Sequence, residues 1–276
     1  MNNLHRELAP VSDAAWAAIE EEVARTFKRH LAGRRVVDVS GPAGVGFSAL
    51  GTGHVRPIDP PLEGVAARQR EVQALVEFRV PFELDRQAID DVERGSNDSD
   101  LQPVKDAARQ LAWAEDRSIF EGYAAAGIGG IRAGSDNPMM TLPSDVRLYP
   151  QLVAKALGQL RLVGVNGPYA LLLSADAYTT LAGGTDHGES VLDHVRTLVK
   201  DEVLWAPGII GGFLLTTRGG DFELQIGQDL SIGYASHNEH SVQLYLQETF
   251  TYRTLTAEAA VVLSPGGAAA SAAGAT

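Results

Sequence analysis

The chain has 276 residues, of which 45% are hydrophobic and 21% are charged, and its formal net charge is −12. This length allows one large domain or two small ones, with a core of substantial size. The acidic balance argues against binding a nucleic-acid backbone over a broad surface, because such binding needs clustered Lys and Arg side chains. The absence of cysteine excludes disulfides, thiolate metal sites and cysteine nucleophiles.

The apolar residues also bear on where the protein resides. No apolar run approaches the roughly 20 residues that a membrane-spanning helix needs. Residues 1–7 lack the basic stretch and apolar core of a secretory signal. We therefore expect a cytoplasmic protein that does not bind a membrane.

The first predicted helix covers residues 12–32. Ser12 and Asp13 are typical of an N-cap. Gly33 is expected to end the helix as its C′ residue, and residues 36–39 then predict a strand. Apolar side chains recur along the helix at steps of three and four and give it one apolar face: Trp16, Ile19, Val23, Phe27 and Leu31.

Residues 40–66 are rich in Gly and Pro and show little periodicity. Such a stretch is too long for an ordinary connection inside a compact domain, so we expect an excursion with its own partner. Its start, Gly41 to Ser48, has the glycine spacing of a phosphate-binding loop, but Phe47 stands where that loop needs a Lys. We therefore interpret this start as a glycine-rich turn.

Helical and extended patterns alternate over the rest of the chain. Residues 100–122 predict a helix of about 20 residues and roughly 30 Å, with Pro103 in its first turn. Two alternating strands are predicted around residues 230–234 and 247–250. The region from about 130 to 212 predicts a compact α+β unit with helices at 150–162, 175–181 and 190–200 and a strand at 169–173.

Two polar clusters invite a chemical interpretation. Residues 237–240 resemble a zinc-protease motif with the spacing one residue short, and a turn between two strands explains them better. In the other cluster, glycines on both sides of its first histidine, His187, favour an exposed loop over a rigid site. No nucleophile with a base in reach is evident, so we expect no catalytic residue and no metal site. This second cluster consists of His187, Glu189, Asp193 and His194.

Short motifs occur in one order from the first residue to about Leu263. They include Leu8-Ala9-Pro10, Phe27 to Val39, Ile89 to Gly95, Glu115-Asp116-Arg117, Gly167-Pro168-Tyr169, Arg218 to Phe222, Gly227 to Tyr234 and Gln247 to Phe250. Their number and order resemble the encapsulins, bacterial shell proteins also catalogued as linocin-like bacteriocins. The N-terminal half is most similar to the actinobacterial members.

The resemblance implies an α+β fold, that of the tailed-phage capsid proteins of the Hong Kong ninety-seven type. Residues 71–84 would be the returning strand of an extended loop that reaches over a neighbouring subunit. The tail, rich in Ala and Gly, would be disordered and lie outside the shell. The implied parts are an N-terminal helix and strand of the peripheral domain (1–39), the extended loop (40–84), the peripheral domain with its spine helix (85–129), the axial domain (130–212), the peripheral C-terminal strands (213–263) and the tail (264–276).

The resemblance further implies a shell subunit that is not an enzyme. Copies would assemble into an icosahedral shell of the smallest (T=1) type around a cargo enzyme, captured by its C-terminal peptide. The cargo would be a dye-decolourising peroxidase or a ferritin-like protein, in oxidative-stress or iron handling. The implied peptide-binding residues are Phe27, Leu31, Arg34, Asp38, Leu230, Ile232 and Tyr234, with Asp38 suited to a basic peptide residue.

Three further expectations follow from the resemblance. Some encapsulins bind flavin through an aromatic pair, but the key position here is Gln87, so we expect no flavin and no other cofactor. A phage-derived capsid subunit that packages nucleic acid and a secreted bacteriocin or protease-like protein remain as alternatives; the acidic balance argues against the first. The loop that lines the fivefold pore would consist of Asp186, His187, Gly188 and Glu189.

Overall fold

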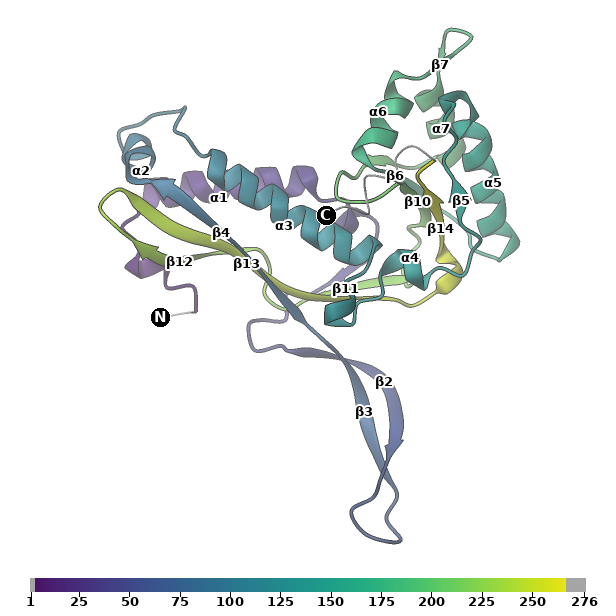
Figure 1. Ribbon diagram of the computed structural model, residues 1–276, viewed down its shortest axis with the longest axis horizontal. Coiled ribbons are helices and arrows are strands. Elements are labelled where there is room, and N and C mark those ends of the chain that lie inside the picture. Colours follow the sequence, from purple (N-terminus) through teal and green to yellow (C-terminus); the bar gives the residue numbers. More distant parts are fainter. Residues whose placement is uncertain (1–2, 267–276) are drawn as a thin grey trace.

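The computed structural model describes residues 3–266, and Figure 1 shows an elongated body, a second lobe and an arm. The body and the second lobe each contain a five-stranded sheet, and the arm is a two-stranded hairpin. No helix within residues 3–266 is long and apolar enough to cross a membrane. The mixture of separate helices and sheets confirms the predicted α+β class.

The body is a sheet with two long helices on one face. Alternate side chains of the longest strand, Val242, Leu244 and Leu246, point toward these helices and are buried against them. The strand order is β1-β11-β13-β12, with β4 also paired to β13. The elements are α1 (Asp13–His30), β1 (Asp38–Ser40), β4 (Val76–Asp85), α2 (Arg86–Glu93), α3 (Gln102–Phe120), β11 (Phe222–Ile226), β12 (Ser231–His237) and β13 (Ser241–Thr254).

The second lobe is built around the sheet order β5-β14-β10-β6-β9. Every residue of β6 and β10 is buried, as expected for central strands covered on both faces. The predicted helices and the predicted strand at 169–173 are all present. The elements are α4 (Gly130–Gly134), β5 (Met140–Thr141), α5 (Tyr149–Leu162), β6 (Tyr169–Leu173), α6 (Ala175–Gly183), β7 (Thr185–Asp186), β8 (Glu189–Ser190), α7 (Val191–Val199), β9 (Val203–Trp205), β10 (Gly212–Thr216) and β14 (Ala260–Ser264).

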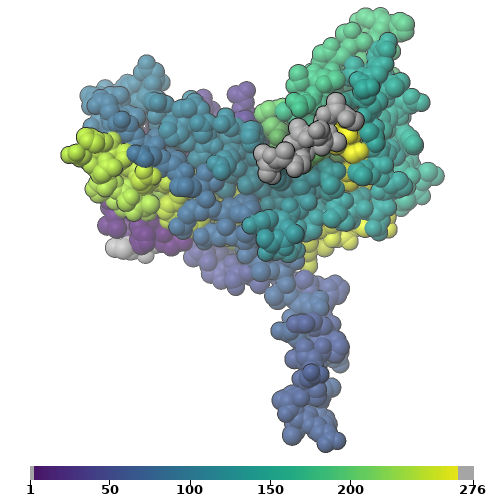
Figure 2. Space-filling model, viewed as in Figure 1, coloured from purple at the N-terminus to yellow at the C-terminus, as the bar shows by residue number. Residues whose placement is uncertain are grey.

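The arm consists of β2 (Ala49–Ile58) and β3 (Ala67–Ala74), and Figure 2 shows it standing clear of the body. A lone two-stranded hairpin is marginally stable in water. The arm therefore needs another surface to cover its exposed apolar side chains, which are Val55, Ile58, Leu62, Val65 and Val72.

The end of α1 differs from the prediction. The helix ends at His30, and Leu31 caps it in an extended conformation. Gly33 instead begins a 3-10 turn, η2 (Gly33–Arg35), where a Cβ would lie only 2.6 Å from Cδ1 of Ile119. Close packing, not the helix end, thus requires glycine. The strand predicted at 36–39 is also displaced, since β1 begins at Asp38.

The sheets divide the strands differently from two of the expected parts of the chain. The expected returning strand, 71–84, is two strands: β3 stays in the arm, and β4 pairs with β13 along its whole length. Residues 213–263 do not all return to the body, because β10 and β14 pair with each other in the second lobe. The predicted tail lies outside the described residues from residue 267 onward.

Four further 3-10 turns connect these elements, within the part of the chain that the structure describes. They are η1 (Arg6–Leu8), η3 (Ala124–Ala126), η4 (Val146–Leu148) and η5 (Ala257–Ala259).

Candidate functional site

Three of the predicted peptide-binding residues are core residues of the body. Phe27 and Leu31 continue the apolar face of α1 and are 5% and 8% exposed, and Ile232 on β12 is 4% exposed. All three belong to one apolar cluster with side chains from α3, β4 and β13. Their contribution to packing is therefore established, whereas the surface that they offer to a ligand is small.

A groove lies beside these residues, between α1, β12 and the N-terminal segment. Figure 1 shows where these three elements lie in the body. We call it the α1–β12 groove. It measures about 260 Å³. Its lining is apolar, apart from Ser231 and an Arg6–Glu20 ion pair of 2.6 Å, and consists of Leu4, Arg6, Glu20, Val23, Ala24, Leu230, Ser231 and Ile232.

Tyr234 continues the same edge of β12. Its backbone N–H donates to the Leu4 carbonyl at 2.8 Å, so the N-terminal segment is hydrogen-bonded to the strand. Its ring is partly buried against the core cluster of the body, and its hydroxyl lies 2.6 Å from Nδ1 of His237. Leu230 and Tyr234 are thus the predicted apolar residues that retain accessible surface.

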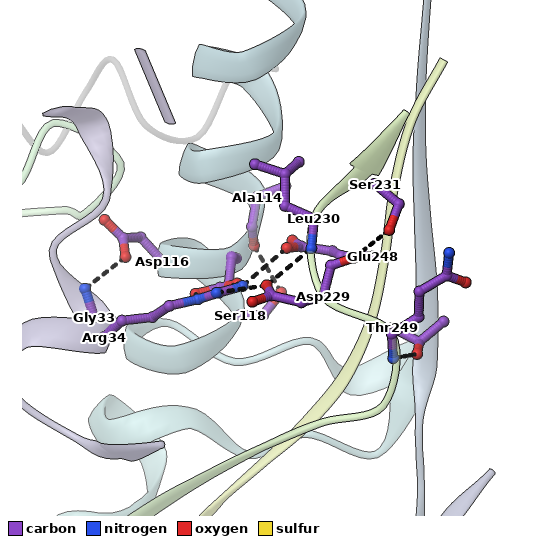
Figure 3. Close-up of polar contacts among 12 residues, drawn as sticks. Gly33, Arg34, Ala114, Asp116, Ser118, Asp229, Leu230, Ser231, Glu248 and Thr249 are labelled. Atoms are coloured by element: carbon purple, nitrogen blue, oxygen red, sulfur yellow. Dashed lines mark hydrogen bonds and ion pairs between the residues drawn. The ribbon is translucent and has the colours of Figure 1, made fainter. Parts of the chain in front are cut away.

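Arg34 contacts three carboxylates, of which Figure 3 labels Asp229 and Glu248. Its Nε lies 2.9 Å from Oε1 of Glu115, and its Nη2 lies 2.6 Å from Oε2 of the same residue. Nη2 also contacts Oε2 of Glu248 at 3.1 Å, and Nη1 contacts Oδ1 of Asp229 at 2.7 Å. The guanidinium also lies 5.2 Å from the centre of the Phe27 ring.

Asp116, the residue after Glu115 on α3, binds the same turn. Its carboxylate accepts the Ala32 N–H at 2.8 Å and the Gly33 N–H at 2.7 Å. Glu115, Asp116 and Glu248 are completely buried. Together with Arg34 and Asp229 they form what we call the Arg34 cluster.

Burial shifts the proton affinities in this cluster. Burial raises the pKa of Asp116 to about 8, against the lowering effect of its two backbone donors. Burial, and then the negative charge of Glu115, raise the pKa of Glu248 well above its usual value. Burial lowers the pKa of Arg34, but the contacts with Glu115, Asp229 and Glu248 outweigh this and raise it.

Asp38 lies apart from the groove. Its carboxylate accepts the Gly220 N–H at 2.6 Å, and it aligns across β11 with Arg253 of β13. Tyr234 aligns with Leu244 of the same strand. At about 3.4 Å per residue, positions 244 and 253 are roughly 30 Å apart along β13, and they point to opposite faces of the sheet. The structure therefore does not bring Asp38 together with Tyr234.

The predicted pore residues form the tip of the β7–β8 hairpin at the far end of the second lobe (Figure 1). His187 has a left-handed φ of 49°, and its side chain is 96% exposed. His194 lies on α7, which begins at Val191, so the two histidines do not share a helix. Within residues 3–266, no group of three or more His, Cys, Asp or Glu side chains could hold a metal ion.

The other interpreted motifs have structural roles. Residues 41–48 form a turn in which the Phe47 N–H donates to the Gly44 carbonyl at 3.1 Å, and a strand follows instead of the helix of a phosphate-binding loop. Residues 238–240 are the tip of the β12–β13 hairpin, as predicted. Gln87 is exposed on α2, and its amide donates to Asp91 at 2.9 Å.

The sequence analysis missed the acidic members of the Arg34 cluster. The sequence nevertheless contained a partial indication that these acids are buried. Glu115 and Asp116 fall on the apolar side of α3, four residues after Leu111 and Ala112. Glu248 likewise occupies an inward position of an alternating strand. A charged residue at an apolar position indicates a buried partner, but the pattern does not identify that partner.

The sequence is similar to that of known shell proteins. Residues 1–251 match the protein family described as "Encapsulating protein for peroxidase". The type 1 encapsulin shell proteins of Rhodococcus erythropolis and Mycobacterium tuberculosis are each 58% identical over 264 residues, which covers 96% of this chain and 100% of those proteins. The type 1 encapsulin shell protein of Rhodospirillum rubrum is 47% identical over 270 residues, covering 95% of this chain and 96% of its own.

Solved structures show the same fold at low sequence identity. A chain of the virus-like particle from Pyrococcus furiosus has a TM-score of 0.63 and 12% identity, and covers 90% of this chain and 98% of its own. A chain from Mycobacterium phage Bobi has a TM-score of 0.55 and 12% identity, and covers 86% of this chain and 90% of its own. The predicted tailed-phage capsid fold is thereby confirmed, and the named relatives are shell proteins. The chain belongs to the encapsulin shell proteins.

Proposed function

We propose that copies of this chain assemble in the cytoplasm into a closed icosahedral shell of the smallest (T=1) type around an enzyme cargo. The observation that carries the proposal is the arm. Its exposed apolar residues, Val55, Leu62 and Val72 among them, need cover that this chain's own body does not supply. Closed symmetric assembly by contacts between unlike surfaces would provide that cover from a second copy.

Each part of the chain would have its own role in assembly. The arm would be the extended loop, and the body would be the peripheral domain with α3 as its spine helix. The second lobe, now including β10 and β14, would be the axial domain. The hairpin tip of Asp186, His187, Gly188 and Glu189 would line the fivefold pore, in accord with its exposure at the end of this lobe.

Cargo would be captured by a C-terminal peptide bound in the α1–β12 groove. Leu230 and Tyr234 would contact the apolar peptide residues, with the buried Phe27, Leu31 and Ile232 as the floor beneath them. Asp38 would contact a basic residue only in a peptide long enough to reach the opposite face of the sheet. A dye-decolourising peroxidase is the first candidate cargo, which the family description supports, and a ferritin-like protein is the second.

Size-exclusion chromatography and negative-stain microscopy of the purified chain test the assembly. Uniform hollow spheres in the megadalton range support it, and a monomer or small oligomer refutes it. Nucleic acid inside the particles would favour the alternative capsid role.

Cargo capture is tested by co-expression with a fluorescent protein that ends in a peptide of Gly, Ser, Leu, Ile and one Lys. Leu230→Ser should yield normal shells with less fluorescence. Leu255→Ser, at a half-exposed position after β13, is the matched control. Equal loading of both variants would remove Leu230 from the site.

A further inference from the structure

The Arg34 cluster contains more buried acid than buried base. Three carboxyl groups, those of Glu115, Asp229 and Glu248, contact one guanidinium. The buried carboxyl of Asp116 lies beside them and accepts the Ala32 and Gly33 N–H groups. If the three buried carboxyl groups, those of Glu115, Asp116 and Glu248, were all ionised, Arg34 would leave an excess of two buried negative charges. Each uncompensated buried charge costs several kcal/mol, so the cluster must bind protons to remain folded.

The contacts identify Glu248 as a carboxyl that holds a proton. Glu115 presents both oxygens to Arg34, at 2.6 to 3.0 Å, as an ionised partner does. Glu248 reaches the guanidinium with one oxygen at 3.1 Å, and its Oε1 is buried without a hydrogen-bond partner among the described residues. A protonated carboxyl avoids placing a second buried charge beside Glu115.

Glu248 faces charged groups from every polar element around it. Glu115 comes from α3, Arg34 from η2 and Asp229 from the turn before β12. The strand β4 adds no charge, because Phe78 is the residue paired with Glu248. Loss of the Glu248 proton would therefore increase repulsion among carboxylates that share one cation.

The guanidinium links this buried acid to the wall of the groove (Figure 3). Arg34 binds Oδ1 of Asp229, and the same oxygen accepts the Leu230 N–H at 2.8 Å. The Asp229 carbonyl accepts the Ser231 hydroxyl at 2.6 Å. Leu230 and Ser231 both line the α1–β12 groove. The conformation of that wall thus depends on how strongly the guanidinium is attracted to Asp229 and not to the buried carboxyl groups.

We propose that the Arg34 cluster is a proton-dependent positioning device for the α1–β12 groove. With Glu248 neutral, the charge of the guanidinium is shared between Glu115 and Asp229, Nη1 stays on Asp229, and the turn at 229–231 is held. When Glu248 ionises, it competes for the guanidinium, the turn loosens, and an apolar peptide in the groove is bound more weakly. This peptide-binding consequence rests on the proposed function of the groove, whereas the loosening of the turn does not.

Backbone hydrogen exchange tests the device in assembled shells at pH 6 and pH 9, corrected for the intrinsic effect of pH on exchange. The wild-type amides of residues 230–231 should lose about tenfold or more of their protection at pH 9, because the open state becomes more populated. Glu248→Gln should keep its protection. Glu223→Gln, which removes a carboxyl from the opposite face of the sheet, should behave as the wild type. Unchanged protection in the wild type would overturn the proposal even if Glu248→Gln failed to fold.

Binding of a fluorescent peptide of Gly, Ser, Leu, Ile and one Lys separates the two proposals. Wild-type affinity should fall about tenfold from pH 6 to pH 9, and affinity of Glu248→Gln should not. A peptide that never binds, together with amides that respond to pH, would refute the groove function but support the device. A peptide that binds equally at both pH values to shells whose amides do not respond would refute the device alone.

Discussion

Replacing Arg34 by Met would leave the buried Glu115 carboxylate without its cation. The Arg34 side chain is 18% exposed, and its partners Glu115 and Glu248 are 0% exposed. Removing one partner of a buried ion pair costs about 3–5 kcal/mol, because the remaining charge is unpaired in a medium of low dielectric constant. Arg35 is a matched control, because its 2.8 Å pair with Glu202 is about half exposed on both sides. Loss of such a pair costs about 0–1 kcal/mol.

Thermal unfolding of shells at equal protomer concentration would measure the difference, since assembly contributes to apparent stability. We expect Arg34→Met to unfold well below the wild type at pH 7, and Arg35→Met to unfold close to it. At pH 5 the unpaired carboxyls bind protons, so the deficit of Arg34→Met should shrink. Equal unfolding temperatures for the two variants, or a deficit of Arg34→Met that does not change with pH, would refute the reasoning.

Four other outcomes are expected. Phe27→Ala should destabilise the fold by about 3–5 kcal/mol and lower the melting temperature, because Phe27 is a core residue. A normal melting temperature with less cargo in the shells would instead make Phe27 a peptide contact. Gly33→Ala should cost about 1–3 kcal/mol in urea unfolding, because its Cβ would overlap Ile119, and an unchanged midpoint would contradict the packing argument. The pKa of Asp116 is about 8 in the folded state against a usual 3.8, so the folded state binds an extra proton between these pH values. The free energy of unfolding measured in urea should therefore fall as the pH rises from about 4 to 8, and Asp116→Asn should remove this contribution to the slope. A free energy that rises with pH, together with an unchanged slope in Asp116→Asn, would contradict the argument. Replacing the arm by a short turn should abolish shells while circular dichroism still reports a folded chain, and shells built without the arm would be the contrary result.

The elements that the sequence predicted well are those with a local signal. The stripe of α1 has steps of three and four, and Ser12 caps the helix, so the start and the buried face followed from about 20 residues of sequence. The buried strand β6 was likewise predicted at its observed bounds. The arm could be predicted because residues 40–66 are too long for a connection inside a compact domain. The boundary between β3 and β4 could not be predicted.

What could not be predicted depends on contacts between distant parts of the chain. Arg34 meets Glu115, Asp229 and Glu248 at separations of 81, 195 and 214 residues. No local pattern states which acid an arginine will find, so the sequence did not predict the three carboxylates that Arg34 contacts. Gly33 is a similar case, since its requirement comes from Ile119 on another helix. The return of β14 to the second lobe is a choice of sheet that strand periodicity does not encode.

Burial divides the predicted peptide-binding residues and limits which of them can set cargo specificity. Phe27, Leu31 and Ile232 cannot change size without leaving a cavity or a clash in the core of every subunit. Leu230 and Tyr234 lie at the edge of that core, where a different side chain alters the groove at small cost to the fold. A change of cargo preference among encapsulin shells should therefore be achieved at the edge positions and not at Phe27. Because the turn that carries Leu230 is hydrogen-bonded to Arg34 through Asp229, we expect edge substitutions to change cargo preference only while the proposed Arg34 device holds the turn in place.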